Sequence, residues 1–197
     1  MNIGKYKIIT LGLICLLSYS IAGTLSGHVK YDGKAPRSKK LRMDADPVCG
    51  SSHSSPVYSE SFKMAADGSM EEALVYLKKV DYSGGVPNTP AVLDQKGCIY
   101  VPHVLGMVAG QELLIKNSDA TLHNIHSMPK INKEFNFAMP KVVKEKKTSF
   151  GKVEEPFYIK CDVHPWMKTW VFVSDHPYYA VTDANGNFSI DGIPDGT

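Results

Sequence analysis

The feature that most constrains the fold is a succession of short β-like runs separated by turn residues. The runs are rich in Val, Ile, Leu, Tyr and Phe, Gly, Pro, Asn and Asp punctuate them, and no long amphipathic helical pattern interrupts them. This pattern is typical of an all-β sandwich. Strands are expected over residues 24–31, 73–80, 99–104, 112–116, 122–127, 156–161, 169–173, 179–182 and 188–190.

Two stretches rich in turn residues divide the chain. Residues 32–56 and 83–90 are dense in Gly, Pro and Ser, a composition typical of loops. We therefore expect an N-terminal β segment with loops over residues 23–90, a central domain over 91–175 and a further β segment over 176–197. Within this last segment, Asn185-Gly186 between β-formers predicts a hairpin over residues 181–190.

The first residues differ from the rest of the chain. Lys5 and Lys7 precede an apolar run over residues 8–17, and small residues follow up to Ala22 and Gly23. This is the pattern of a secretory signal cleaved after Ala22. The run is shorter than the roughly 20 residues that span a bilayer, so we expect a periplasmic or otherwise exported protein that is not stably inserted in a membrane.

Charge excludes one class of partner. Removal of residues 1–22 lowers Lys plus Arg from 22 to 20, which balances the 20 Asp plus Glu. Binding to nucleic acid needs a concentrated excess of positive charge, so no nucleic-acid partner is expected. The basic run over residues 141–147 is most simply a solvated loop or strand edge.

Export changes what the cysteines predict. Three of them, Cys49, Cys98 and Cys161, follow the expected cleavage point, and paired cysteines tend to form disulfides in an oxidising compartment. Cys49 and Cys98 lie in turn-like surroundings, whereas Cys161 lies between a strand-like run and a histidine. A disulfide between Cys49 and Cys98 is therefore predicted, and it leaves Cys161 free.

The strongest chemical signal is a Cys, a His and a Met at successive spacings of three, directly after a β-like run. These residues are Cys161, His164 and Met167. A short loop leaving a strand can fold three such side chains onto one metal ion. Thiolate, imidazole and a weak thioether, joined by a second imidazole, are the ligands of a blue-copper centre. Met128 and Met139 are alternative thioethers, but Met167 shares the loop with His164.

The second imidazole has two candidates, His123 and His126. They are three residues apart, so on an extended strand they face opposite sides of the sheet. His123 shares a face with Ile125, whereas His126 shares one with Leu122 and Asn124. Periodicity alone does not choose between them.

The segments Leu-His-Asn-Ile-His and Cys-Asp-Val-His-Pro-Trp-Met together resemble the amicyanin and plastocyanin group of cupredoxins, over about residues 97–174. The resemblance implies a Greek-key β-sandwich with one copper ion held by His123, Cys161, His164 and Met167. It further implies that Asn124 ties the two ligand loops together. Pro165 and Trp166 would form an apolar docking patch beside His164.

The two ends of the chain carry a second resemblance. Residues 182–197 and 25–33 resemble parts of carboxypeptidase-regulatory-like and starch-binding-like β-sandwich modules, in which a further strand normally follows. Either the chain is truncated or its two ends pack together around the central domain.

The expected function is one-electron transfer to a redox partner such as a cytochrome or dehydrogenase. With all four metal positions supplied by protein, no open position remains for a substrate, so no enzymatic or catalytic residue is expected. Two alternatives remain, a copper storage or delivery protein and a carbohydrate-directed β-sandwich binding module.

Overall fold

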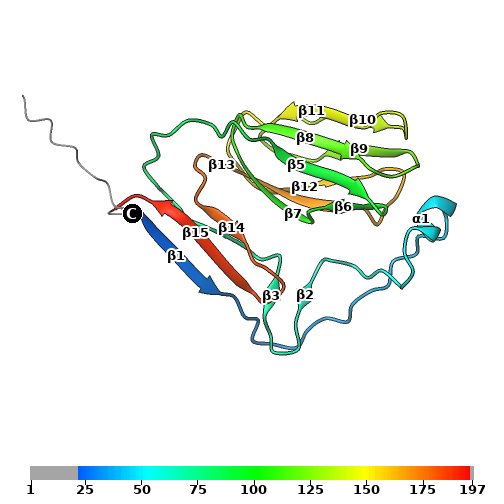
Figure 1. Cartoon of the computed structure of the whole chain (residues 1–197), viewed down its shortest axis with the longest axis horizontal. Helices are drawn as coiled ribbons and strands as arrows, with labels where there is room; N and C mark the ends of the chain where they lie inside the picture. Colours follow the sequence, from blue (N-terminus) through cyan, green and yellow to red (C-terminus); the bar gives the residue numbers. More distant parts are fainter. Residues whose placement is uncertain (1–21, 196–197) are drawn as a thin grey trace, which may run out of the picture.

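Two facing sheets form the centre of the molecule in the computed structural model, which describes residues 22–195 (Figure 1). Except for Ala22, the expected signal segment lies outside the described residues. One sheet has the order β10, β9, β12, β13, β7, and the other has the order β11, β8, β5, β6. We call residues 91–174, which contain both sheets, the sandwich. The strands of the first sheet are β10 (Asn136–Met139), β9 (His123–Ser127), β12 (Glu154–Lys160), β13 (Lys168–Ser174) and β7 (Val104–Val108). Those of the second are β11 (Glu145–Ser149), β8 (Glu112–Asn117), β5 (Ala91–Lys96) and β6 (Ile99–Val101).

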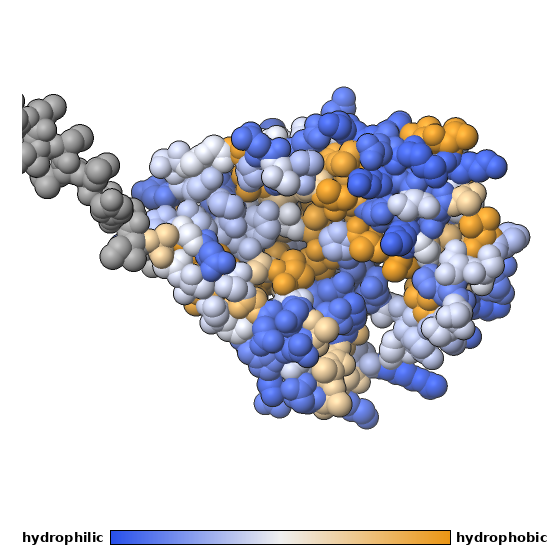
Figure 2. All heavy atoms as spheres, viewed as in Figure 1, coloured by the Kyte–Doolittle hydropathy of each residue, from blue (hydrophilic) through white to orange (hydrophobic). Residues whose placement is uncertain are grey.

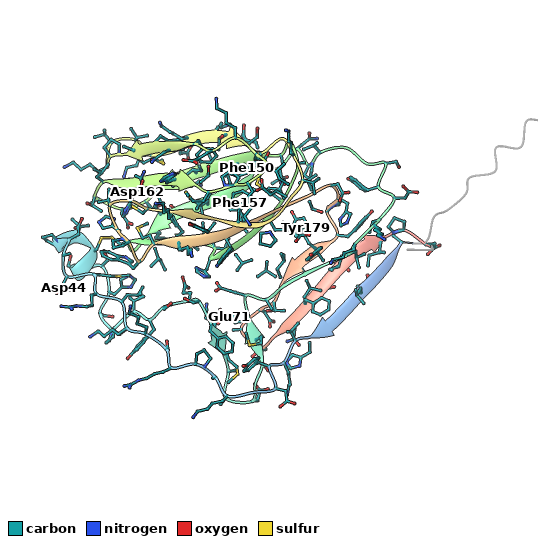
Figure 3. All side chains as sticks on the ribbon, turned by 180° about the vertical axis from the view of Figure 1, so that it is seen from behind. Asp44, Glu71, Phe150, Phe157, Asp162 and Tyr179 are labelled. Atoms are coloured by element: carbon teal, nitrogen blue, oxygen red, sulfur yellow. A yellow bond between two sulfur atoms is a disulfide. The ribbon has the colours of Figure 1, made fainter. Side chains whose placement is uncertain are left out.

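Alternating burial along the strands builds the core of the sandwich. In β8, Leu113 and Ile115 are fully buried while their neighbours are half-buried, as expected for a strand that packs one face on another sheet. The rings of Phe150 and Phe157 meet edge to face inside this core, with centroids 4.9 Å apart (Figure 3). The expected all-β sandwich is therefore confirmed.

The two ends of the chain pair beside the sandwich and form what we call the flank. β1 (Gly23–His28) pairs with β15 (Asn187–Ile193), and β4 (Leu74–Tyr76) pairs with β14 (Tyr179–Val181), all antiparallel. Val80, Tyr178 and Ile190 form a separate small core here. The flank therefore takes strands from both ends of the sequence (Figure 1).

The hairpin expected around Asn185-Gly186 forms only as a turn. Gly186 has a φ of 76° and its N–H donates to the carbonyl of Asp183, while the Asp183 carboxylate accepts from the N–H groups of Asn185 and Asn187. The strands that the turn joins pair with β4 and β1 instead of each other, so the prediction of a hairpin was wrong. Strands from the N-terminal part of the chain take the pairing positions that a hairpin would use.

Residues 29–72, which we call the arm, carry little regular structure. They contain the two-residue strands β2 (Lys63–Met64) and β3 (Met70–Glu71), which pair with each other, and the helix α1 (Pro47–Ser51). Asp46 caps α1 and Pro47 occupies its first turn, a sequence order that starts helices. A disulfide between Cys49 and Cys98 joins α1 to the sandwich, as the sequence predicted. Figure 1 shows α1 at the end of the sandwich opposite the flank.

Several strands escaped prediction. β5, β10 and β11 were not expected, and β7 was expected only at its first residue. β11 consists of charged and hydroxyl residues, and it is a strand because it pairs with β8 along one edge of the sheet. The basic run over residues 141–147 leads into this edge strand, in agreement with its predicted role. Within residues 22–195 no helix is long and apolar enough to cross a membrane.

Candidate metal centre

The expected metal donors come from two neighbouring strands at one end of the sandwich. His123 is the first residue of β9, and Cys161 directly follows the last residue of β12. Because β9 and β12 are paired, with Lys160 opposite His126, these two ends lie side by side. The loop after Cys161 is closed by two backbone bonds, from the N–H of Cys161 to the carbonyl of Met167 (3.2 Å) and from the N–H of Met167 to that of His164 (2.9 Å).

Three donor atoms converge in this corner. The Nδ1 atoms of His123 and His164 are 2.9 Å apart, and Cys161 Sγ lies 3.9 Å from His164 Nδ1. All three donors lie within 4.8 Å of one another, and the three side chains are almost fully buried. Two imidazoles and one thiolate in such a triangle match the strong ligands of a mononuclear copper site.

The surroundings favour the metal-binding form of the cysteine. Burial alone would raise the pKa of the Cys161 thiol, but hydrogen bonding from His123 and from backbone N–H groups, including that of His164, lowers it below its usual value. Burial would lower the pKa of His123, yet the Asp119 carboxylate and Cys161 raise it to about 9. The pocket therefore stabilises a thiolate beside a positive charge. A metal cation bound in the same place would also be stabilised by this thiolate.

A carboxylate holds the outer nitrogen of each imidazole. Asp119 Oδ2 accepts from His123 Nε2 at 2.8 Å, and Asp46 Oδ2 lies 3.2 Å from His164 Nε2. This arrangement leaves the Nδ1 atoms of both rings facing inward, where they can bind a metal. Asp119 belongs to the sandwich, where it also accepts from the N–H groups of Gly97 and Cys98. Asp46 belongs to the arm, where its other oxygen caps α1.

Sequence reasoning missed both carboxylates. Asp119 lies four residues before His123 in a turn-like stretch, and Asp46 precedes a proline in a helix-starting pattern. Residues 32–56 were expected to be loops, so α1 and its cap were not predicted. Nothing in the sequence indicates that the second oxygen of Asp46, Oδ2, reaches His164, which is 118 residues away.

The thioether candidates occupy different positions. Met167 is almost fully buried in the same hydrophobic cluster as Cys161, at the end of the loop that holds His164. Met139 is fully buried, but its sulfur accepts a hydrogen bond from Gln95 Nε2 at 3.2 Å. Met128 is half-buried beyond the end of β9. Met167 therefore remains the candidate for a weak fourth ligand.

His126 lies on the opposite face of β9 from His123. Its Nδ1 is 2.8 Å from Asp162 Oδ2 and its Nε2 is 2.8 Å from Glu134 Oε1, both at the surface. The structure thus brings His123, and not His126, to Cys161 and His164. His126 instead holds Asp162, the residue after the thiolate.

Asn124 connects the two donor segments. Its Oδ1 accepts the backbone N–H of Asp162 and its Nδ2 donates to Asn136, while its carbonyl accepts from the Tyr100 hydroxyl. The bond from Asp162 thus joins β9, which begins at His123, to the loop that follows Cys161.

The expected docking residues are not equally open. Pro165 is exposed, but Trp166 is half-buried, and its indole N–H donates to the carbonyl of Cys98 at 2.9 Å. The rings of Trp166 and His164 lie with centroids 5.0 Å apart. His164 itself is only 3% exposed because Asp46 and Cys49 cover its outer edge. Figure 3 shows Asp44, next to α1, at the same end of the molecule as Asp162.

The disulfide determines which cysteine near the site can supply a thiolate to a metal. Cys49 and Cys98 each lie within reach of a histidine and an aspartate, but they are bonded to each other and offer no thiolate. Among the described residues, Cys161 is the free cysteine. The triangle of His123, Cys161 and His164 is therefore the donor group that retains a thiolate.

Comparison with known proteins finds cupredoxins among the solved structures, whereas no family model and no curated protein matches. A purple cupredoxin from Nitrosopumilus maritimus is 24% identical over 43% of this chain and 99% of its own, with a TM-score of 0.36. A reduced amicyanin variant is 23% identical over 45% of this chain and 86% of its own, with a TM-score of 0.39. A copper-containing nitrite reductase from Thermus scotoductus is 19% identical over 50% of this chain and 26% of its own, with a TM-score of 0.38.

These likenesses agree with the resemblance to cupredoxins seen in the sequence, and one of the matched proteins is an enzyme. With TM-scores this low, they carry no argument about function. That argument depends on the side chains of this chain.

Proposed function

We propose that the chain is an exported electron carrier that binds one copper ion through His123, Cys161 and His164, with Met167 as a weak fourth ligand. The observation that carries the proposal is the buried triangle of two Nδ1 atoms and one thiolate sulfur. A copper ion bound there would supply a one-electron couple between Cu(I) and Cu(II).

The residues around the triangle support fast electron transfer because they hold the donors in one geometry. Asp119 fixes the ring of His123 and Asp46 fixes that of His164. The backbone N–H of His164 donates to Cys161 Sγ at 3.3 Å, which orients the sulfur. Ligands held in this way need to move little between oxidation states, so little energy is spent on rearrangement.

Burial supports a carrier over a catalyst. The three donor side chains are at most 3% exposed, so water and substrates have no direct approach to the triangle. Cys161 would lose its proton on binding, a step that the lowered pKa of its thiol makes easier.

The test is an absorption spectrum of the purified protein titrated with Cu(II). We expect an intense visible band from thiolate-to-copper charge transfer that saturates at one equivalent and bleaches reversibly with ascorbate. The protein loaded with Zn(II) is the matched control, and it should stay colourless. Weak ligand-field absorption alone, or copper that an exogenous chelator removes at once, would contradict an electron carrier; the second result would favour a storage or delivery protein.

A further inference from the structure

We propose that the redox partner is an acidic protein that docks in a basic groove between the arm and the sandwich, with Trp166 as the contact nearest to His164. The groove has a volume of about 610 Å³, and Lys39, Lys40 and Arg42 of the arm and Lys168 of the sandwich line it. The inference depends on the proposed electron transfer, which it completes by naming the docking surface and the class of partner.

Direct contact with the imidazole of His164 is closed by the arm. His164 Nε2 lies 3.2 Å from Asp46 Oδ2 and 3.7 Å from Cys49 Sγ, and the disulfide to Cys98 holds this cover in place. A redox partner therefore contacts a residue next to His164 and not the edge of the imidazole itself.

Trp166 is the neighbour that reaches the groove. Its ring packs on His164 and is also part of the groove wall, next to Pro165. Trp170 lines the same wall and is 36% exposed. One wall of the groove is therefore aromatic and lies beside the loop that holds His164. Figure 2 shows the surface hollowed between the arm and the sandwich.

Positive charges outnumber negative charges around the groove. Four cationic side chains line the groove, all of them exposed, against one carboxylate, that of Glu60. Within residues 22–195 none of the four forms an ion pair, and Lys168 Nζ lies over the rings of Tyr158 and Trp170, 4.2 and 4.9 Å from their centres. Glu60, in contrast, lies 3.7 Å from Lys63 Nζ and 3.8 Å from His103 Nδ1. Unpaired cations around a hollow raise the local concentration of anionic partners and speed their encounter.

The other basic segment, residues 141–147, is less available. Lys147 pairs with Glu112 at 2.9 Å, and Lys144 donates to the carbonyls of Asn117 and Asp119. These contacts use part of the positive charge that a partner would otherwise meet.

The mixture of surfaces fits a protein partner. An aromatic centre surrounded by a charged, solvent-exposed rim is the usual anatomy of a protein–protein contact, and redox encounters use small contacts of this kind. The complementary surface would carry carboxylates around its own redox centre.

The first experiment maps anion binding by NMR with hexacyanochromate(III), which is paramagnetic and redox-inert. We expect selective broadening of the indole N–H signals of Trp166 and Trp170 and of the Lys168 amide. Broadening centred on residues 141–147, or spread evenly, would overturn the proposed surface. The map is recorded on both the copper-loaded and the metal-free protein, so failure of the groove and failure of copper binding are separate results.

A matched pair of charge reversals tests the route of the electron. Lys168→Glu and Lys141→Glu change the net charge equally, but only Lys168 lines the groove. At low ionic strength Lys168→Glu should slow oxidation of the reduced protein by ferricyanide about tenfold and accelerate oxidation by tris(phenanthroline)cobalt(III). High salt should remove both effects, and an equal response of Lys141→Glu would overturn the proposal.

The class of partner is tested with two polyanions of equal length, a deca-glutamate peptide and a single-stranded DNA decamer. We expect the peptide to shift the Trp166 and Lys168 signals at least as strongly as the DNA. If the DNA binds the groove and the peptide does not, the assignment of an acidic protein is wrong.

Discussion

The sandwich and the arm both contribute to the candidate metal centre, but the two regions are held by different forces. The main core contains 16 buried residues, all between Ala91 and Val173, whereas the buried cluster under the arm consists of Met43, Cys49 and Cys98. Burial of apolar area therefore stabilises the sandwich, and a cross-link attaches the arm. The donors come from the first region and the cover of His164 comes from the second.

The difference shows that the position of the metal donors and the access of water and partners to them can be controlled by separate regions. A donor must be placed within fractions of an ångström, which packed strands achieve. A cover has only to keep water and partners away from one ring edge. Here the cover consists of the carboxylate that caps α1 and the disulfide from the middle of that helix.

The largest expected effect comes from Cys161→Ser. This change removes the sulfur that would give the visible band, so the colour of the copper protein should be lost completely. Because the core of the sandwich has many other members, far-UV circular dichroism should stay close to that of the wild-type protein. Retention of the band would show that the thiolate is not a ligand.

The second effect separates the two histidines of β9. His123→Ala removes one Nδ1 of the triangle and should abolish the band, whereas His126→Ala should leave most of it, since His126 contacts Asp162 and Glu134 at the surface. Spectra of both variants at equal copper loading provide the measurement. The reverse outcome would place the donor on the other face of β9, and two unchanged spectra would remove β9 from the site.

Contacts that are local in sequence were predictable. The spacing of Cys161, His164 and Met167 after a strand indicated one loop, and export with three remaining cysteines indicated the disulfide. The alternation of side chains along a strand placed His123 and His126 on opposite faces of β9. It did not show which of the two faces the core, because that depends on the sheet opposite β9. Only the sequence resemblance favoured His123.

Contacts between distant segments were not predictable. Asp46 reaches His164 because the arm folds back across the end of the sandwich, and β11 is a strand because β8 offers it an edge. That the two ends of the chain pack together was one of two expectations, but the sequence did not indicate that β1 would pair with β15. In each case the partner that decides the structure lies far away in the sequence, and local propensity carries no information about it.

The third prediction concerns the cross-link between the two regions. Cys49→Ala with Cys98→Ala opens a loop that spans 49 residues, and the chain-entropy model gives a loss of about 4 kcal/mol in the free energy of unfolding. The arm should loosen, so transfer of copper to a chelator should become faster while the colour persists. Guanidinium unfolding and stopped-flow chelation measure the two effects.

The double variant Cys49→Ser with Cys98→Ser is the matched control for the alanine pair, since it breaks the same bond, keeps side chains of similar size and adds no thiol that could bind copper. If chelation is as slow in both double variants as in the wild-type protein, the disulfide does not hold the cover over His164.

The smallest expected effect is a pH dependence that originates in the arm. Glu72 lies just after β3, next to Glu71, a residue that Figure 3 shows far from Asp162. Its side chain is 17% exposed, and its Oε2 has no hydrogen-bond partner among residues 22–195. Burial is the main cause that raises the pKa of Glu72 to about 7, Glu60 and Glu71 add to it, and Lys63, 3.5 Å away, opposes it.

A carboxyl with a raised pKa binds its proton more tightly in the folded protein, so its contribution to stability is full below pH 4.5, the ordinary value, and is lost as the pH rises through about 7. The free energy of unfolding should fall by about 2 kcal/mol across this window. Glu72→Gln should make this decline shallower and stabilise the protein at pH 8, whereas Glu71→Gln, which removes an equal charge nearby, should leave it nearly as steep. The part that remains is expected from His123, whose pKa is also raised. Denaturant unfolding at pH 5 and pH 8 provides the comparison. A decline that is equally steep in Glu72→Gln and in the wild-type protein would show that Glu72 is not its origin.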